Sequence, residues 1–597
     1  MNVADYIVNF LVKKGVKTIF MLTGGQAMFL NDSVYRHKTI TPIFTHHEQA
    51  AGMAAEAYGR AYGELGVAMV TAGPAGLNIL NGVVGALVDS APMMVISGQS
   101  NSSVIEYMEQ NDIRQYGIQG INMAPFGKAS TKYFKRVDDP SKIAYYLEEA
   151  YYLAMSGRTG PVWIDVPLDI QRMQVPEKLL THFQPPKETT PQPRSSDINQ
   201  LLNMLKKAKR PLLLAGQGIK IAHAEKELDE LLKLLKAPVI TTRLGIDLID
   251  SNNRLFAGRP GLYGDRYANF AVQNADLIIA IGARLDTGLV GYDPKDWGRN
   301  AKKVVVDLES SELAKPGVSI DLKIQSDAKV FIAEVLKQGK KIIFPSFSEW
   351  VKICNQWKEK YPTTLPEYRQ EKLVNTYYFS DVLSDIASND DSILIDTSSC
   401  FHVVCQAWKI KKGQRFMTTG GLSTLGYWPA GLGLAMTSPK KRTIVITGDG
   451  SLSMNIQELA TIKQNNLPIK LFIFNNNGYL LIRHTQKTHM EGRFMGESPE
   501  TGLWLPDMLE IAKTYKIKGV RISSSRNLAS KLKAVLDYDG PVICDVMTPL
   551  WQPIVPRISS YKKPDGTMVS KTYEDMFPFL SRKELMENEL GVPPKED

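Results

Sequence analysis

Two polar side chains with the chemistry of magnesium ligands follow apolar runs in the last third of the chain. Residues 443–447 (TIVIT) form a β-branched run that predicts a buried strand, which leads into Asp449 in a Gly-Asp-Gly turn. A helical segment leads to a second apolar run, residues 469–474, which is followed by Asn476. Strand–helix–strand units cross over with parallel strands, so neighbouring strands would bring both side chains to one carboxyl edge of a sheet.

The ligand types at this edge suit a divalent cation that also contacts phosphates. Mg²⁺ prefers carboxylate, amide and carbonyl oxygens and completes its shell with water and phosphate. The glycine turn, and a helix N-terminus that Ser451 can cap, favour a diphosphate at the same place. The alternative is an ordinary turn, because Gly-Asp-Gly alone is common. Asn476 follows Asp449 by 27 positions, and this interval makes the combination far more specific.

A second group of polar residues lies near the N-terminus. The sequence His46-His47-Glu48-Gln49 precedes a segment of small residues, AAGMAAEAYGRAYG, and a glycine-rich turn follows at residues 73–76. Taken alone, Glu48 would compensate the dipole at a helix N-terminus, and the histidines would be surface or satisfied core groups. The alternative, a carboxylate that serves a cofactor, depends on what the rest of the chain resembles.

The composition bounds the class of protein. With 597 residues, of which 44% are hydrophobic and 22% charged, the chain is predicted to be soluble and to form three or four domains. It has no apolar run of about 18 residues, so no membrane span is expected, and its N-terminus predicts an amphipathic helix. The net charge of +9 is dispersed, which favours a solvated surface over a nucleic-acid site. The four cysteines have neither metal nor disulfide spacing, which predicts a cytoplasmic location.

Alternating strand and helix signals divide the chain into three predicted α/β domains, each a doubly wound parallel sheet. The first covers residues 1–172, and a proline-rich linker leads to the second, residues 195–340. The third, residues 373–550, contains the strands next to Asp449 and Asn476. Residues 551–597 are predicted to form a C-terminal arm or a lid. The strands predicted in the first two domains are 18–22, 67–70, 93–97, 160–167, 211–215, 239–241, 277–281 and 303–307.

Seven segments spread over nearly the whole chain resemble the acetolactate synthase-like (acetohydroxyacid synthase) branch of the thiamin-diphosphate decarboxylase superfamily. They are HHEQAAGMAAEAYGRA, VTAGPAGLN, DSAPMMVISGQ, GPVWIDVPLDIQ, ADLIIAIGARLD, TTGGLSTLGYWPAGLGLA and GDGS…NNNGY. Together they are highly specific for the superfamily and less specific for the reaction. The resemblance implies that the first domain binds the pyrimidine half of thiamin diphosphate and that the third binds its diphosphate with Mg²⁺. The two halves would come from two chains, so we expect at least a homodimer and plausibly a tetramer.

The resemblance also implies roles for individual residues. Glu48 would hydrogen-bond the pyrimidine ring and promote the proton relay that activates the cofactor. Leu425 would hold the cofactor in its bent shape, and the Ser423 carbonyl would accept from its amino group. Asp449, Asn476 and the Gly478 carbonyl would hold Mg²⁺. The remaining predicted cofactor-binding residues are Gly24, Gly25, Pro74, Asn78, Gly448, Gly450, Ser451 and Tyr479, and Gln119 is the second predicted catalytic residue.

The chain departs from the biosynthetic acetolactate synthases around the acceptor. Their aromatic–Gln–Glu triplet corresponds to residues 118–120 (IQG), in which only Gln119 persists. The family arginine that engages the acceptor carboxylate is replaced by Gly288, and the tryptophan that selects larger keto acids is replaced by Thr485. Losing a charged anchor should cost about 1.5–3 kcal/mol of carboxylate recognition. A second keto acid is therefore not the expected acceptor.

Several segments look like those of synthase-like proteins from surface-polysaccharide and unusual-sugar pathways. They are NNNGYLLIRHTQ, GRFMGESPETGLWLPD and the tail PDGTMVS…EDMFPFL. Some of those relatives transfer a two-carbon unit from pyruvate to a nucleotide-linked keto-sugar. Ile118, Arg483, His484 and Gln486 are then predicted to line the acceptor channel. Alternatively, the last three are exposed polar positions after the metal loop.

The central domain keeps part of a flavin-binding pattern. Gly216, Gly218 and Gly282 remain, as do Ala283 and Arg284. In the family this flavin is non-redox and often lost. Bound FAD and a vestigial domain are therefore equal alternatives.

The resulting hypothesis is a carboligase that depends on thiamin diphosphate and Mg²⁺. It would decarboxylate a 2-keto acid, with pyruvate as the expected donor, and join the acyl-anion equivalent to a carbonyl acceptor. The alternatives are acetolactate synthase proper, a simple 2-keto acid decarboxylase, and a hydrolase of cyclic diketones. A non-enzymatic binding protein ranks last, because it would require the loss of Glu48 or Asp449, and both are present.

Overall fold

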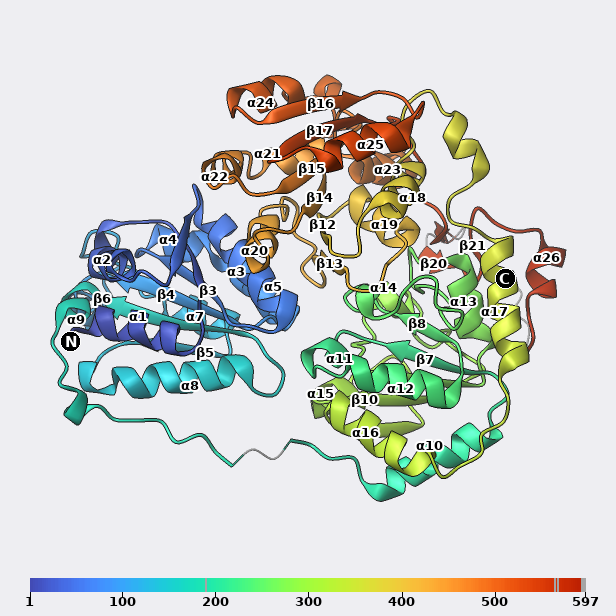
Figure 1. Ribbon diagram of the computed structural model, residues 1–597, viewed down its shortest axis with the longest axis horizontal. Helices are drawn as coiled ribbons and strands as arrows, with labels where there is room; N and C mark the ends of the chain where they lie inside the picture. Colours follow the sequence, from blue (N-terminus) through green and yellow to red (C-terminus); the bar gives the residue numbers. More distant parts are fainter. Residues whose placement is uncertain (188–189, 563–564, 566–567, 592–597) are drawn as a thin grey trace.

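The computed structural model describes residues 1–187, 190–562, 565 and 568–591 (Figure 1). The described residues contain three parallel sheets of six, five and six strands, which confirms the predicted α/β class. Helices cover the faces of each sheet, as Figure 1 shows in blue, green and orange to red. In the described part of the chain, no helix is long and apolar enough to cross a membrane. The predicted domain boundaries stay a prediction.

The first and third sheets have the same topology. Their strands run in the orders β2-β1-β3-β4-β6-β5 and β13-β12-β14-β15-β17-β16, so each position in one sheet has a counterpart in the other. The first is built from β1 Thr18–Met21, β2 Thr41–Phe44, β3 Gly66–Val70, β4 Met93–Gln99, β5 Tyr133–Arg136 and β6 Pro161–Pro167. The third is built from β12 Ser392–Ile395, β13 Arg415–Thr418, β14 Thr443–Gly448, β15 Ile469–Asn475, β16 Lys518–Ile522 and β17 Val542–Met547.

In the central sheet, the chain adds successive strands first on one side and then on the other. The strand order is β11-β10-β9-β7-β8, so the chain builds outward from β7 to one side and then to the other. Open parallel sheets bind ligands in the crevice at such a switch point, beyond the carboxyl ends of the strands. The strands are β7 Pro211–Ala215, β8 Val239–Thr241, β9 Leu277–Ile281, β10 Lys302–Asp307 and β11 Leu322–Gln325.

In the first two domains, the strands that the apolar pattern failed to predict are three partly solvated edge strands. β2, β5 and β11 each pair on one side only, and each has exposed or half-exposed residues along its length. A strand that is buried on both faces gives a continuous apolar run, whereas an edge strand is partly solvated and loses this signal.

Helix α3 (Glu48–Tyr62) of the first domain packs against the third domain. Its small residues allow close approach by α20 (Ala430–Thr437) of the third domain, and one hydrophobic cluster contains residues of both helices. A Cβ atom on Gly433 would lie 1.9 Å from the Ala54 carbonyl oxygen, so a larger residue would force these helices apart. Two polar contacts extend this interface, because His46 N donates to Glu458 at 3.0 Å and Thr461 Oγ1 donates to the Phe44 carbonyl at 3.1 Å.

The other helices fill the layers around the sheets, and the predicted N-terminal helix is present as α1. In the first domain they are α1 Val3–Lys13, α2 Met28–Arg36, α4 Pro74–Asn78, α5 Leu80–Val88, α6 Ser102–Gln110, α7 Ala124–Ser130, α8 Ile143–Met155 and α9 Leu168–Arg172. Around the central sheet they are α10 Ser195–Lys207, α11 Gly218–Ile221, α12 Glu225–Leu235, α13 Arg266–Asn274, α14 Thr287–Val290, α15 Ser310–Ala314, α16 Ala328–Gly339 and α17 Ser348–Lys360. In the third domain they are α18 Thr376–Ile386, α19 Ser399–Ala407, α21 Asp449–Ser453, α22 Glu458–Gln464, α23 Leu480–His489, α24 Met508–Thr514 and α25 Leu528–Asp537.

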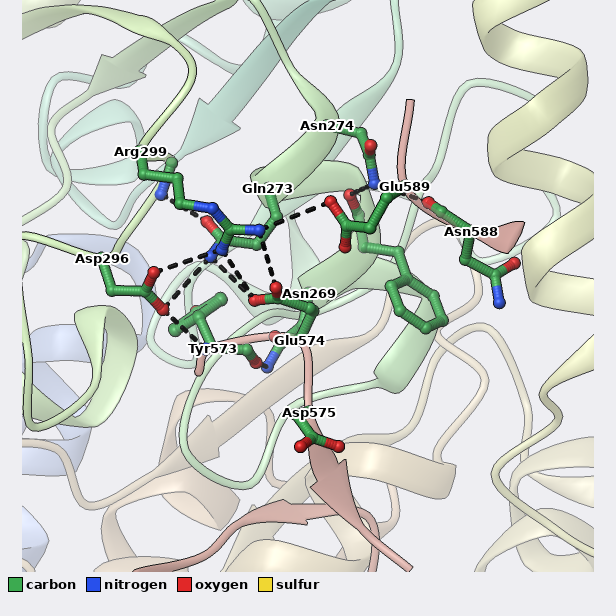
Figure 2. Close-up of polar contacts among 12 residues, drawn as sticks. Asn269, Gln273, Asn274, Asp296, Arg299, Tyr573, Glu574, Asp575, Asn588 and Glu589 are labelled. Carbon is green, nitrogen blue, oxygen red and sulfur yellow. Dashed lines mark hydrogen bonds and ion pairs between the residues drawn. The ribbon is translucent and has the colours of Figure 1, made fainter. Parts of the chain in front are cut away.

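Residues 571–591, which we call the C-terminal strap, return to the central domain (Figure 1). The strap includes β21 Met576–Phe577 and α26 Arg582–Glu587, and β21 pairs with β18 Arg557–Ile558. Its buried Glu574 forms an ion pair with Arg299 at 2.7 Å and accepts from Gln273 of α13 at 2.9 Å (Figure 2). Part of the predicted tail motif, residues 563–564 and 566–567, lies outside the described residues, as do residues 592–597. Whether the tail also acts as a lid stays a prediction.

The strap is predicted to dock less stably as the pH rises. Glu589 shares Arg299 with Glu574 and Asp296 (Figure 2), and burial, together with the Glu574 charge, raises the pKa of Glu589 to about 7. An acid whose pKa is raised in the folded state stabilises that state while protonated, so the contribution is complete at low pH and lost as the pH rises towards 7. We expect docking to weaken from pH 5.5 to pH 8 by on the order of 1–3 kcal/mol.

Hydrogen exchange measured by mass spectrometry over residues 571–591, corrected for intrinsic rates at each pH, would test this expectation. Glu589→Gln should remove most of the pH dependence. Glu587→Gln, at an exposed position of the same segment, should preserve it. Equal pH dependence in the wild type and in Glu589→Gln would contradict the assignment to Glu589.

Candidate active site

Asp449 and Asn476 lie at the same carboxyl edge, as predicted, because β14 and β15 are parallel neighbours with Gly448 paired to Phe474. Asp449 begins α21, and its two carboxylate oxygens accept from Gly450 N at 2.8 Å and from Gly478 N at 3.1 Å. Burial raises the pKa of Asp449 to about 6, although the backbone N–H groups oppose this shift. The expected helix cap at Ser451 is wrong, because Gly448 is the N-cap and Ser451 lies inside the helix, which begins at Asp449.

The side-chain oxygen of Asn476 is the strongest sign of a ligand here. Oδ1 is buried and has no hydrogen-bond partner in the protein, which is costly unless something else binds it. Gly478 has φ +145°, and a Cβ there would lie 1.9 Å from the Glu497 carbonyl oxygen, so only glycine fits this turn. One carboxylate, one unpartnered amide oxygen and one carbonyl fit Mg²⁺ that takes its other ligands from phosphate and water. The described residues contain no group of three or more His, Cys, Asp or Glu side chains that could hold a metal ion.

Arg483 lies behind this loop. Its side chain is only 2% exposed and forms an ion pair with Glu497 at 2.6 Å. The same guanidinium donates to the carbonyls of Asn476 at 3.4 Å and Asn477 at 3.3 Å. These contacts position the backbone on which the predicted metal ligands lie.

The other predicted channel residues also have protein partners. His484 Nε2 contacts the Gln552 carbonyl at 2.9 Å, and Gln486 exchanges hydrogen bonds with the backbone of Met495. Tyr479 lies over Gly450, where a Cβ would come within 2.2 Å of the tyrosine ring. The acceptor-channel roles of Arg483, His484 and Gln486 stay predictions.

Residues 420–426, which we call the cofactor loop, carry Ser423 and Leu425. Ser423 has φ +50°, a conformation that favours glycine, and its hydroxyl contacts Thr397 Oγ1 at 2.8 Å. Leu425 is partly exposed, as a side chain that packs on a ligand would be. The loop is joined to the predicted metal site because Gly426 N donates to Ser451 Oγ at 2.8 Å.

Two buried acids that the sequence analysis did not single out hold this loop in place. Asp396 accepts from Ser451 Oγ at 2.6 Å and from Tyr427 N at 2.9 Å. Asp89, from the first domain, accepts from Gly420 N at 2.7 Å and Gly421 N at 2.9 Å. Asp89 begins the segment DSAPMMVISGQ, which resembles the family, but that segment gave it no role. Asp396 had only its place after an apolar segment, which is too common to be specific.

Asp89→Ala is predicted to weaken cofactor binding. The substitution leaves two backbone N–H groups unpaired and removes the carboxylate that lies 3.4 Å from buried Arg60. We expect the dissociation constant of thiamin diphosphate to rise about 10-fold and the unfolding free energy to fall by about 3 kcal/mol.

Fluorescence titration and thermal melts would measure both effects. Asp89→Asn keeps an acceptor oxygen and should have a smaller effect, and Asp112→Asn, at an exposed position, should have none. Unchanged cofactor affinity in Asp89→Ala would show that the loop does not need this anchor.

Glu48 begins α3 and is 7% exposed. Asn78 Nδ2, at the end of α4, donates to Glu48 Oε2 at 3.0 Å, so two predicted cofactor residues are in contact. Pro74 begins α4 directly after Gly73, where a Cβ would lie 2.3 Å from the Gln119 carbonyl oxygen. Gln119 is exposed and has φ +60°. The structure therefore places residue 119 beside the turn that leads to Asn78.

The remaining predicted residues surround this end of the first sheet. Gly24 packs so closely on Thr71 that a Cβ on Gly24 would lie 2.5 Å from the threonine side chain, whereas Gly25 faces open space. Ile118 is 80% exposed, and its carbonyl accepts from Ser100 Oγ at 3.0 Å. Among the described residues, no hydrogen bond joins Glu48 to Asp449, Asn476 or Leu425.

A cavity of about 580 Å³ lies among the three domains, at the switch point of the central sheet. Gly216 and Gly218 approach Gly282 so closely that a Cβ on either would lie 2.1 Å and 2.7 Å from its backbone. Gly288 and Ser423 both line the cavity, which therefore reaches the cofactor loop. Its position and size suit a nucleotide, so the residues of the flavin pattern fit such a ligand without requiring a flavin.

The chain matches three domain models of thiamine pyrophosphate enzymes. The N-terminal TPP binding domain matches residues 1–121, the central domain matches residues 198–335, and the C-terminal TPP binding domain matches residues 396–546. The acetolactate synthase large subunit of Cyanidium caldarium is 32% identical over 93% of this chain and 94% of its own length. A probable acetolactate synthase large subunit of Methanococcus aeolicus is 31% identical over 91% and 92%. The chloroplastic acetolactate synthase of Arabidopsis thaliana is 29% identical over 93% and 83%.

Proposed function

The chain belongs to the acetolactate synthase-like branch of the thiamine pyrophosphate enzymes, and we propose that it transfers a two-carbon unit from pyruvate to a carbonyl acceptor other than a free 2-keto acid. A nucleotide-linked keto-sugar is the acceptor class that we favour. The observation that carries the activity is the loop of Asp449, Asn476 and Gly478, in which a buried amide oxygen has no protein partner. The acceptor proposal is supported by Gly288, which lines the cavity next to the cofactor loop at the position where the family has an arginine.

Individual residues of the chain would have the following roles in the reaction. Bound thiamin diphosphate supplies the centre that stabilises the carbanion left by decarboxylation. Asp449, Asn476 and the Gly478 carbonyl would hold Mg²⁺ beside the diphosphate. Glu48, kept in place by Asn78, would hold the proton that is exchanged with the pyrimidine ring. Leu425 and the Ser423 carbonyl would orient that ring.

A homodimer is part of the proposal, and a tetramer is compatible with it. Large apolar side chains near the Glu48 end are exposed in the single chain, namely Leu77 at 37%, Ile118 at 80% and Phe126 at 41%. Exposed apolar residues of this size gathered at a functional edge support burial by another subunit. The cytoplasmic location stays a prediction.

Acetolactate synthase proper is the second candidate, and the names of the relatives favour it. Carbon-labelled pyruvate with thiamin diphosphate and Mg²⁺, followed by NMR, separates the candidates. Acetolactate from pyruvate alone would establish the synthase. A labelled two-carbon branch that forms only with a keto-sugar would support our proposal. Labelled aldehyde without ligation would indicate a simple decarboxylase, and the absence of CO₂ would exclude pyruvate as the donor.

A further inference from the structure

Arg243 lies in the wall of the cavity and, among the described residues, forms no ion pair. It follows β8, and its guanidinium carbon lies 4.4 Å from the centre of the Phe401 ring. Its Nη2 lies 3.3 Å from Nδ1 of His402. Among the described residues, no carboxylate lies within ion-pair distance of Arg243.

The other two arginines of the cavity are paired with carboxylates. Arg158 forms ion pairs with Glu309 at 2.6 Å and Glu312 at 3.0 Å. Arg284 lies 3.6 Å from a carboxylate oxygen of Asp286 and 3.9 Å from one of Asp89. Each acid of the cavity accepts at least one hydrogen bond, from a backbone N–H group or from an arginine. These acids are Asp89, Asp286, Asp307, Glu312 and Asp327. Arg243 is therefore the lining arginine that, among the described residues, has no carboxylate within ion-pair distance.

The surroundings of Arg243 are aromatic. The rings of Tyr263 and His402 are stacked with their centres 3.8 Å apart. Burial and the Arg243 charge lower the pKa of His402 well below its usual value, so the imidazole is neutral and can accept from the guanidinium. Burial also lowers the pKa of Arg243. An enclosed cation without an anion is costly, and a bound anion would offset that cost.

We propose that Arg243 binds the anionic group, phosphate or carboxylate, of the carbonyl acceptor. The inference rests on the proposed function and assigns its acceptor to this cavity. Gly288 and Ser423 line the same cavity, so a molecule held at Arg243 extends towards the cofactor loop. Tyr263 and the neutral His402 form the flat wall on which a ring of the acceptor packs. Arg243 thus supplies a positive charge to an acceptor site in which Gly288 offers none.

Three probes distinguish the possible sources of the anion. 2-Ketobutyrate and propanal are paired acceptors that differ in the carboxylate, and UDP tests recognition of a diphosphate. FAD tests whether the charge instead serves a dinucleotide cofactor. The variants are Arg243→Gln, which removes the charge, and Arg243→Lys, which keeps it. Arg369→Gln is the matched control, because Arg369 also lies over an aromatic ring, 5.6 Å from the centre of Tyr378, but outside the cavity.

We expect Arg243→Gln to lower UDP affinity, or the kcat/KM ratio of 2-ketobutyrate to propanal, by about 10- to 100-fold. Arg243→Lys should restore part of the loss, and Arg369→Gln should match the wild type. If Arg243 had a merely structural role, Arg243→Gln would lower kcat/KM equally for both acceptors and leave their ratio unchanged. That result would overturn the inference. Loss of FAD affinity alone would also overturn it, in favour of a dinucleotide site.

Failure of the proposed function would look different. Wild-type protein would then release no CO₂ from pyruvate and form no ligation product with any carbonyl acceptor, a nucleotide-linked keto-sugar included. The UDP titration would still report whether Arg243 binds an anion.

Discussion

Glu48→Gln is expected to lower turnover by about 10²- to 10⁴-fold while thiamin diphosphate still binds. The carboxylate is buried at the N-terminus of α3 and is held by Asn78 Nδ2 at 3.0 Å. Glutamine has nearly the same shape and keeps an oxygen for this hydrogen bond, so the fold and the pocket should persist. What it loses is the ability to take up and return a proton. The expected defect is therefore in proton exchange rather than in cofactor affinity.

Two measurements separate these quantities. Fluorescence titration gives the affinity for thiamin diphosphate, and NMR gives the rate of hydrogen–deuterium exchange at its C2 position on the protein. Exchange should slow by a factor similar to that of turnover. Glu106→Gln, the same substitution at an exposed position of the first domain, should leave both unchanged. Near-normal exchange in Glu48→Gln would remove Glu48 from the proton relay.

The fold was predictable where burial leaves a continuous apolar run. The strands 211–215, 239–241 and 277–281 were predicted with the bounds that β7, β8 and β9 have, because each is buried throughout. Edge strand β5 was missed, since all four of its residues are half-buried and give no such run. The matching strand orders of the first and third sheets could not be predicted from the apolar pattern either. Strand order depends on contacts between segments that are far apart in sequence.

The site was predictable where chemistry needs a fixed local spacing. Asp449 and Asn476 follow neighbouring strands, so the crossover rule alone brings them to one edge. Asp89 and Asp396 could not be found in this way, because each acts on a loop that is distant in sequence and carries no spacing of its own. Arg243 was missed for the same reason. Its lack of a counter-ion is a property of the folded cavity and not of the residues beside it in the chain.

Asp449→Ala is expected to abolish the Mg²⁺-dependent retention of thiamin diphosphate, with at least a 100-fold loss in metal affinity by analogy with the removal of a charged ligand. The same substitution leaves Gly450 N and Gly478 N without their acceptors, which should lower the unfolding free energy by about 1–3 kcal/mol. A weaker fold could therefore imitate the loss of a metal ligand.

Asn476→Ala removes this ambiguity. Oδ1 of Asn476 has no partner in the protein, so removing this oxygen breaks no hydrogen bond within the protein. If the oxygen is a metal ligand, Asn476→Ala should keep its melting temperature without ligands and yet lose the rise in melting temperature that Mg²⁺ and thiamin diphosphate cause together. The adjacent Asn477 is exposed and has φ +56°, so Asn477→Gly is the matched control and should retain the full rise. A full ligand-induced rise in Asn476→Ala, together with unchanged cofactor affinity in Asp449→Ala, would exclude this loop as the metal site.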